Sequence, residues 1–143
     1  MTDIVFHFNA TERLTYVCRL LRKAVMTSAQ VVVTGSREQL CELDSALWTF
    51  SPIDFVPHCD SDADSNLVKK SPVILATSLQ ELPYSSILLN LSSSIPDGFK
   101  QFGRVIEVVS LDEAEKKQAR ARWKRYSDMG MNMMSHDVGV LCA

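Results

Sequence analysis

The sequence predicts an α/β fold close to the doubly wound class, a three-layer sandwich whose mostly parallel central sheet has about five strands. Short β-branched runs alternate with helical stretches, and the order strand, helix, strand, helix favours a largely parallel sheet. Apolar residues make up 46% of the 143 residues and charged residues 22%, as in a folded globular protein of one-domain size. We therefore expect a single domain over residues 1–143, with helices on both faces of the sheet.

The N-terminal half supplies two pairs of strand and helix. Residues 4–8 are a short run of β-branched and aromatic residues, which predicts a strand. From 12 to about 27, apolar positions repeat at steps of three and four, which predicts an amphipathic helix. Residues 31–33 are three valines, typical of a strand covered on both faces, and a second helix begins near residue 37. That helix ends before Pro52, because proline removes a hydrogen-bond donor and restricts the residue before it.

The C-terminal half begins with an irregular stretch. An acidic surface loop is expected at about 58–71, and the next predicted strands are 72–75 and 87–91. The last predicted strand is 105–109. The tail, about 131–143, is rich in methionine and has no clear period, so we expect it to be weakly structured.

A helix is predicted after the last of these strands. Ser110 is its expected cap, and Asp112 and Glu113 lie in the positive first turn. Lys116 to Arg125 lie toward the negative end, so the charges follow the helix dipole.

The net charge and the cysteines exclude several classes of protein. With a net charge of -2, the chain as a whole has no basic field to hold nucleic acid. The four cysteines form no CxxC pair and no His stands at zinc-ligand spacing, so free thiols are expected. No apolar segment has the length that spans a bilayer, and the N-terminus lacks a leader-like run. We therefore expect a cytoplasmic protein with no membrane partner.

The most metal-like stretch is the acidic run of the middle loop. Asp60, Asp62 and Asp64 alternate as carboxylates do when they converge on Ca²⁺ from a tight loop. The sixth place, where such a loop requires glycine, is Ser65, and the twelfth, where it requires a bidentate glutamate, is Ser71. We therefore expect a solvated acidic turn and no metal site.

No catalytic or cofactor motif is present. Gly35 follows a predicted strand, but neither GxGxxG nor GxxxxGK followed by Ser or Thr occurs, so a phosphate loop is absent from the sequence. His7, His58 and His136 lie far apart along the chain, and no GxSxG elbow presents a nucleophile to them. We expect no catalytic residue and no cofactor.

Aromatic residues cluster where the second helix gives way to a proline-bearing loop. Trp48 and Phe50 end the helical stretch, and Phe55, Val56 and Pro57 follow in the loop. A loop buries large aromatics less readily than a helix face does, so a partner-binding patch is one interpretation. Core packing is the other, because aromatics are favoured in both places.

The C-terminal helix carries a basic and aromatic stripe. Residues in this stripe, at steps of three and four, are Lys116, Arg120, Trp123, Lys124 and Ser127. Residues 111–126 hold six Lys and Arg against three Asp and Glu, a local charge of +3. Such a stripe suits an acidic peptide whose carboxylates pair with the cations while an apolar anchor packs beside the indole. A solvated helix face is the alternative.

Taken together, these two features resemble a known family. The segments that carry the resemblance are Leu43-Asp44-x-Ala46-Leu47-Trp48, then Phe55-Val56-Pro57-His58, and later Lys116-x-x-Ala119-Arg120-x-Arg122-Trp123-Lys124-x-Tyr126 with Gly130 and Asn132. Their order and spacing resemble the chi subunit of bacterial DNA polymerase III holoenzyme, from the first strand to about residue 132. The resemblance implies a Rossmann-like α/β fold with no catalytic activity and no nucleotide cofactor.

The resemblance also implies a site for the acidic, phenylalanine-ended C-terminal tail of single-stranded DNA-binding protein. The positions that match this site are Val109, Lys116, Arg120 and Trp123, with Lys124 a weaker member. Two positions depart from the family pattern. Trp123 stands where tyrosine is expected, and Ser127 stands where another basic residue is often found.

A second surface is implied for the psi subunit, which links chi to the clamp-loader complex. The positions that match it are Trp48, Phe50, Phe55, Val56 and Pro57. A helicase partner could share this surface, and DNA would be contacted only indirectly.

Three hypotheses follow. The leading one is a bridging adaptor that binds the tail of single-stranded DNA-binding protein and psi at these two surfaces. The second is a small-molecule or nucleotide-binding α/β enzyme without a recognisable phosphate loop, whose pocket would lie at the strand ends near Thr34, Gly35 and Thr77. The third is an interaction module that works without a psi partner.

Overall fold

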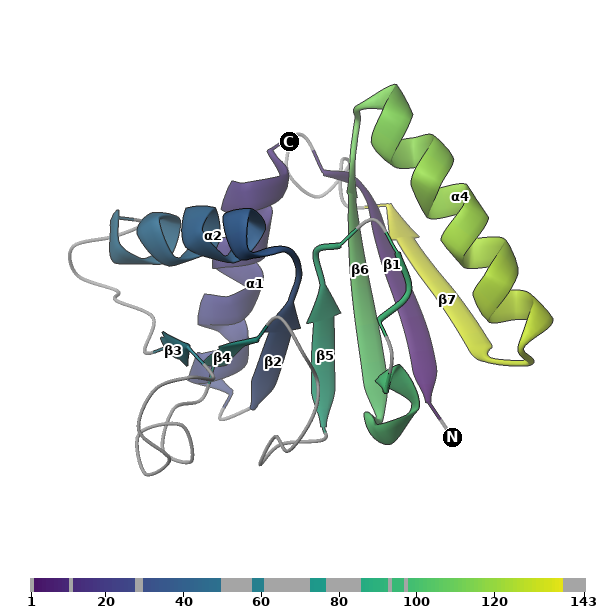
Figure 1. Cartoon of the computed structure of the whole chain (residues 1–143), viewed down its shortest axis with the longest axis horizontal. Helices are drawn as coiled ribbons and strands as arrows, with labels where there is room; N and C mark the ends of the chain where they lie inside the picture. Colours follow the sequence, from purple (N-terminus) through teal and green to yellow (C-terminus); the bar gives the residue numbers. More distant parts are fainter. Residues whose placement is uncertain are drawn as a thin grey trace.

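The computed structural model describes residues 2–10, 12–27, 30–49, 58–60, 73–76, 86–92, 94–96 and 98–137. These residues form an α/β fold in which helices lie on both faces of a parallel sheet (Figure 1). The elements, in chain order, are β1 (Asp3–Ala10), α1 (Arg13–Met26), β2 (Val31–Thr34), α2 (Arg37–Thr49), β3 (His58–Asp60), β4 (Val73–Ala76), β5 (Ile87–Asn90), the 3-10 helix η1 (Phe99–Gln101), β6 (Arg104–Ser110), α4 (Glu113–Asp128) and β7 (Asn132–Asp137). The three-layer, Rossmann-like α/β fold expected from the sequence is confirmed.

Within the described residues, the sheet has seven strands in the order β3-β4-β2-β5-β6-β1-β7, and its pairings are parallel. The five inner strands are the five that the sequence predicts. The two edge strands were not predicted: β3 lies at the start of the expected loop 58–71, and β7 lies in the expected tail 131–143. The prediction of 105–109 as the last strand was therefore wrong. The rest of that loop, 61–71, and the end of the tail, 138–143, fall outside the described residues.

The composition of the edge strand β7 explains why the sequence of this segment did not predict a strand. Asn132–Asp137 contains no β-branched residue and no alternation of apolar and polar positions. It nevertheless pairs with β1 in an unbroken register from Asp3 opposite Asn132 to Phe8 opposite Asp137. The strand therefore forms through hydrogen bonding to a neighbour that is far away in sequence, and local propensity contributes little.

Two apolar clusters hold the layers together, one on each face of the sheet. On one face, α1 and α2 bury side chains such as Leu21 and Leu43 against Val31 and Val33. On the other face, Tyr126 of α4 packs in a cluster that includes Val32. Successive side chains of a strand point to opposite faces, so the three valines of β2 serve both clusters. The prediction of a strand covered on both faces is confirmed.

The starts of α2 and α4 are fixed by side chains that bind free backbone N–H groups. In α2, the backbone N–H of Gln39 donates to Ser36 Oγ (3.2 Å) and the N–H of Ser36 donates to Gln39 Oε1 (2.9 Å), a reciprocal capping box. In α4, the cap is Asp112, whose carboxylate accepts from the N–H of Glu115 at 3.1 Å. The prediction of Ser110 as the cap was wrong. Its hydroxyl accepts from the N–H of Asp112 and also contacts the Glu115 carboxylate, so it supports the cap from the end of β6.

Candidate protein-interaction site

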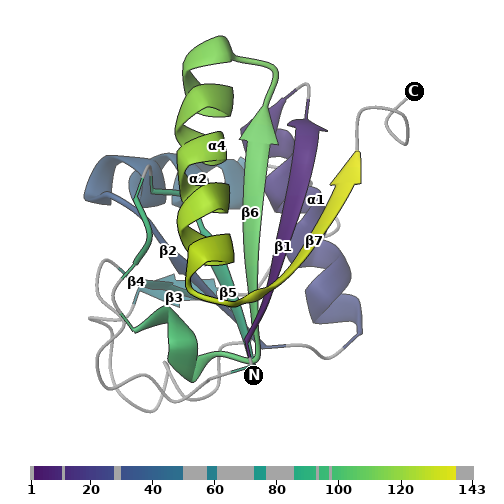
Figure 2. The same ribbon diagram turned by 90° about the vertical axis from the view of Figure 1, so that its right-hand side faces the viewer.

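A groove lies between α4 and the outer strands of the sheet. Figure 2 shows α4 running alongside β6, with β1 and then β7 next to β6. The groove, called here the α4 groove, holds a cavity of about 290 Å³. Its lining residues come from β1, β6, α4 and β7 and are Phe6, Phe8, Asn9, Val109, Lys116, Ala119, Arg120, Trp123 and Ser135.

The base of the α4 groove is apolar. Val109 is 4% exposed and Ala119 is 5% exposed, so together they form a closely packed apolar floor. Trp123 is half-buried and packs edge-on against Phe6, with ring centroids 5.1 Å apart and an interplanar angle of 67°. The indole is therefore fixed in place by the sheet while part of it stays accessible from the cavity.

Two cations flank this apolar base from α4. Lys116 is half-buried, and its Nζ lies 3.9 Å from Glu113 Oε1, a long ion pair with an exposed carboxylate. Arg120 is exposed, and within the described part of the chain its guanidinium makes no hydrogen bond or ion pair. Lys124 is exposed but does not line the cavity. The structure thus brings together Val109, Lys116, Arg120 and Trp123, and it leaves Lys124 outside.

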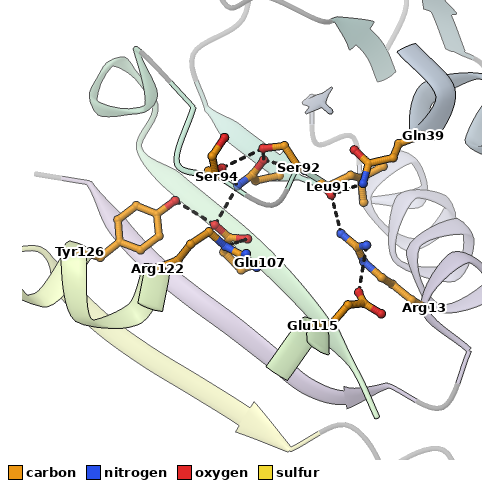
Figure 3. A network of polar contacts seen from close by, with 10 residues as sticks. Arg13, Gln39, Leu91, Ser92, Ser94, Glu107, Glu115, Arg122 and Tyr126 are labelled. Carbon is orange, nitrogen blue, oxygen red and sulfur yellow. Dashed lines mark hydrogen bonds and ion pairs between the residues drawn. The ribbon is translucent and has the colours of Figure 1, made fainter. Parts of the chain in front are cut away.

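A buried polar cluster fixes α4 on the sheet (Figure 3). Glu107 of β6 is completely buried, and its Oε1 lies 3.2 Å from Arg122 Nε. Its Oε2 accepts hydrogen bonds from Tyr126 Oη (2.9 Å) and Asn90 Nδ2 (2.9 Å). Burial raises the pKa of the Glu107 carboxyl, and Arg122 acts in the opposite direction. One of the six basic residues of the helix is therefore a structural anchor and unavailable to a partner.

A second polar chain ties the start of α4 to α1. Arg13 Nη1 lies 3.0 Å from Glu115 Oε1, and Arg13 Nη2 donates to the carbonyl of Leu91 at 2.7 Å (Figure 3). The same carbonyl accepts from Gln39 Nε2 at 2.8 Å. These contacts join α4, α1, α2 and the end of β5 at the carboxyl edge of the sheet.

That polar chain occupies the place where a doubly wound sheet would hold a nucleotide. Ligands of such sheets bind at the carboxyl ends of the strands. Here the space beside the Gly35 backbone is already filled by protein atoms. A Cβ atom added to Gly35 would lie 2.9 Å from Gln39 Oε1 and 3.1 Å from the Cβ of Leu91. Neither the α4 groove nor the larger cavity described below is lined by Thr34 or Gly35, and Thr77 falls outside the described residues. Neither of these two cavities therefore lies at the strand ends that the nucleotide-binding alternative requires.

The aromatic patch cannot be placed in the same way. Trp48 belongs to the last turn of α2, but its side chain is not among the described ones, and Phe50, Phe55, Val56 and Pro57 lie outside the described residues. Leu43 and Leu47, which precede Trp48 on α2, are both 0% exposed and belong to the core.

The described residues contain neither a metal-binding cluster nor a membrane-spanning helix. No group of three or more His, Cys, Asp or Glu side chains there could hold a metal ion. The acidic run that begins at Asp60 lies mostly outside those residues. Over the same part of the chain, no helix combines the length and the apolar character needed to cross a membrane.

Comparison with known proteins decides the family. Residues 1–134 match the family described as DNA polymerase III chi subunit, HolC. The chain is 31% identical to DNA polymerase III subunit chi of Pseudomonas aeruginosa over 141 residues, which is 95% of this chain and 96% of that protein. It is 31% identical to the protein of the same name from Haemophilus influenzae over 85% of each chain, and 29% identical to that of Escherichia coli strain K12 over 87% of this chain and 84% of that one. The chain belongs to the DNA polymerase III chi subunit family. The resemblance seen in the sequence is confirmed, and the chain is a replication protein.

Within this chi-family chain, the sequence pattern missed the half of the α4 groove that the sheet supplies. Phe6, Phe8 and Asn9 come from β1, and Ser135 comes from β7. The alternation of Phe6 and Phe8 in the first strand was a signal that both rings share one face. Glu107 was also visible as the one charged residue in the apolar run 105–109, a position that usually demands a buried partner.

Proposed function

We propose that this protein is a non-catalytic adaptor of the DNA polymerase III clamp-loader complex in the cytoplasm. The α4 groove binds the acidic C-terminal tail of single-stranded DNA-binding protein. The aromatic segment from Trp48 to Pro57 binds the psi subunit, and a helicase could share that segment. DNA is contacted only through these partners.

The observation that carries the tail-binding proposal is the arrangement of charge around an apolar base. A tail that ends in phenylalanine has an aromatic ring and a terminal carboxylate close together, preceded by acidic side chains. Val109 and Trp123 offer the ring an apolar contact surface at the base of a 290 Å³ cavity. Arg120 offers a planar fork of donors to a carboxylate, and Lys116 offers a point charge.

The psi proposal rests on the sequence resemblance and on the family assignment. The match to the family spans residues 1–134 and so includes the segment from Trp48 to Pro57. Aromatic residues beside a proline suit a rigid, apolar interface.

The tail-binding proposal is tested by titrating a fluorescently labelled acidic tail peptide into the full chain and its variants. Arg120→Ala should weaken binding by about tenfold or more, because a charge-assisted hydrogen bond contributes about 1.5–3 kcal/mol. Lys117→Ala is the matched control, since Lys117 is an exposed cation on the same helix that does not line the cavity. Affinity should fall as salt rises for the parent protein and fall less steeply for Arg120→Ala. Equal affinity of the parent and Arg120→Ala would reject the site.

A further inference from the structure

A second and larger cavity lies on the opposite face of the sheet from α4. Its volume is about 730 Å³, and it is lined by α1 together with strands β1, β2, β5, β6 and β7. We call it the α1 cavity. Figure 1 shows α1 and α2 lying together toward the β2 side of the sheet, with β1 and β7 on the other side. The α1 cavity lies between α1 and this face of the sheet.

The floor of the α1 cavity is aliphatic. Val5 and Ile106 contribute from neighbouring strands, Leu20 from α1, and Met134 from β7. Both faces of a parallel sheet are normally covered by other elements, because side chains on both faces are apolar. Among the described elements, none covers Met134 on this face, and it remains half-buried. The floor therefore favours contact with further apolar side chains.

The rim of the α1 cavity is positive. Arg19 and Lys23 lie one turn apart on α1, and Arg104 opens β6 across from them. All three are exposed, and within the described residues none of the three side chains makes a hydrogen bond or an ion pair. No Asp or Glu of the described chain lines the cavity. Asp3, which is opposite Arg104 in the sheet register, instead accepts a hydrogen bond from Asn132 Nδ2 at 3.0 Å.

One end of the cavity is closed by two histidines and a tyrosine. His7 of β1 and His136 of β7 are register partners, with ring centroids 5.6 Å apart, and His7 Nδ1 is hydrogen-bonded to the hydroxyl of Tyr16. Burial, His136 and Arg104 lower the pKa of His7 to about 4, so its ring is neutral at pH 7. The fixed positive charge of the cavity therefore comes from the arginines and the lysine.

We propose that the α1 cavity binds an acidic amphipathic peptide segment of a partner protein. Its apolar side chains pack on the aliphatic floor, and its carboxylates pair with Arg19, Lys23 and Arg104. Charge complementarity selects the acidic class, because the three cations make no ion pair among the described residues and the cavity lining that they share contains no Asp or Glu. A nucleic acid strand fits less well, because binding of bases relies on aromatic stacking, whereas the floor is aliphatic and the rings of His7, Tyr16 and His136 lie only at one end of the cavity. Since the two cavities lie on opposite faces, this partner binds independently of the α4 groove.

The experiment uses a fluorescein-labelled synthetic peptide of about 14 residues, with leucines along one helical face and glutamates on the other. Fluorescence anisotropy measures its binding to the full chain. Arg19→Glu combined with Lys23→Glu should weaken binding at least about tenfold, because like charges then oppose the peptide. Lys117→Glu combined with Arg125→Glu is the matched control. It makes the same change of net charge on exposed residues of α4, and it should leave affinity within about twofold.

Two further peptides separate the parts of the proposal. A peptide with lysines in place of the glutamates should not bind, and one with serines in place of the leucines should bind at least about tenfold more weakly. Absence of saturable binding, or equal loss in both double variants, overturns the proposal. So does an oligothymidylate that displaces the peptide, which would assign the cavity to nucleic acid. Self-association of the parent chain that Arg19→Glu with Lys23→Glu abolishes would assign it to a second copy instead. Failure of Arg120→Ala to affect the acidic tail peptide would leave this inference untouched.

Discussion

The two faces of the sheet carry cavities built from the same two ingredients in different proportions. In the α4 groove, two cations flank a small apolar base that an indole borders. In the α1 cavity, three cations surround a floor of aliphatic side chains. The volume of this cavity is more than twice that of the α4 groove. A narrow site with an aromatic wall suits one anchoring ring and its neighbouring carboxylate. A broad aliphatic site suits several apolar side chains at once. The size and the wall of a cavity therefore distinguish the two expected partners more than charge does.

The faces also differ in how rigidly their cations are supported. α4 is held by a buried ion pair between Arg122 and Glu107, whereas Arg19 and Lys23 project from the exposed side of α1. A rigid support fixes the geometry of the α4 groove, while long flexible side chains on α1 can adapt to different acidic sequences.

The largest effect should come from removing the anchor of α4. Glu107→Ala leaves the buried Arg122 without its counter-charge and should lower the free energy of unfolding by about 3–5 kcal/mol. Glu115→Ala, which breaks the partly exposed pair with Arg13, should cost about 1 kcal/mol or less. Chemical denaturation measures both values. Similar losses in the two variants would show that the buried pair does not hold the helix.

The wall of the α4 groove gives the next effect. Trp123→Ala removes the ring that borders the cavity and should weaken binding of the acidic tail peptide by about tenfold or more. Trp123→Tyr keeps an aromatic ring, the residue type that the family resemblance leads one to expect, and should stay within about threefold of the parent. The melting temperature of each variant shows whether the fold is retained. A Tyr variant as weak as the Ala variant would show that the indole itself, and not an aromatic wall, is required.

On the α1 face, His7 should make the stability of the protein depend on pH. The pKa of His7 is lowered to about 4 in the folded chain, against about 6.5 when unfolded. Between these values the unfolded chain binds more protons, so stability rises with pH. The contribution of the neutral His7 ring to the free energy of unfolding is complete above pH 6.5. It is lost as pH falls from 6.5 toward 4, by about 1–2 kcal/mol after allowance for solvent screening. Denaturation curves of the parent and His7→Gln should therefore converge as the pH falls through this window. If the stabilities of the parent and His7→Gln changed with pH in parallel, the lowered pKa of His7 would be contradicted.

The sequence predicted the interior of this molecule better than its edges. The five inner strands were recognised because runs such as Val31 to Val33 must be apolar on both faces. The edge strand β7 could not be recognised, because its pairing with β1 depends on a register that brings together residues more than a hundred positions apart. Residues on one helix could be found together, because the shared face of Lys116, Arg120 and Trp123 follows from local helical periodicity alone.

The two cavities show the same difference between local sequence signals, which can be predicted, and long-range contacts, which cannot. The α4 groove was half predicted, because one wall is a helix and the other is formed by Phe6, Phe8 and Asn9 of a strand. The α1 cavity was not predicted, because Arg19, Arg104 and His136 meet only through the order of the strands. His7 and His136 do converge, as register partners on β1 and β7, which spacing along the chain did not reveal.

The smallest effect concerns Asn9, at the edge of the α4 groove. Asn9 has a positive φ of 66°, and it lies where the register of β1 with β6 shifts between His7 and Ala10. Left-handed backbone costs most residues about 1–2 kcal/mol, while glycine adopts it freely. Asn9→Gly should therefore change the free energy of unfolding by less than about 1 kcal/mol, whereas Asn9→Ala should lower it by about 1 kcal/mol. If the shape of the strand end is what matters to the groove, the Gly variant should bind the tail peptide within about twofold of the parent. Loss of binding in Asn9→Gly with unchanged stability would instead assign the side-chain amide a direct contact with the peptide.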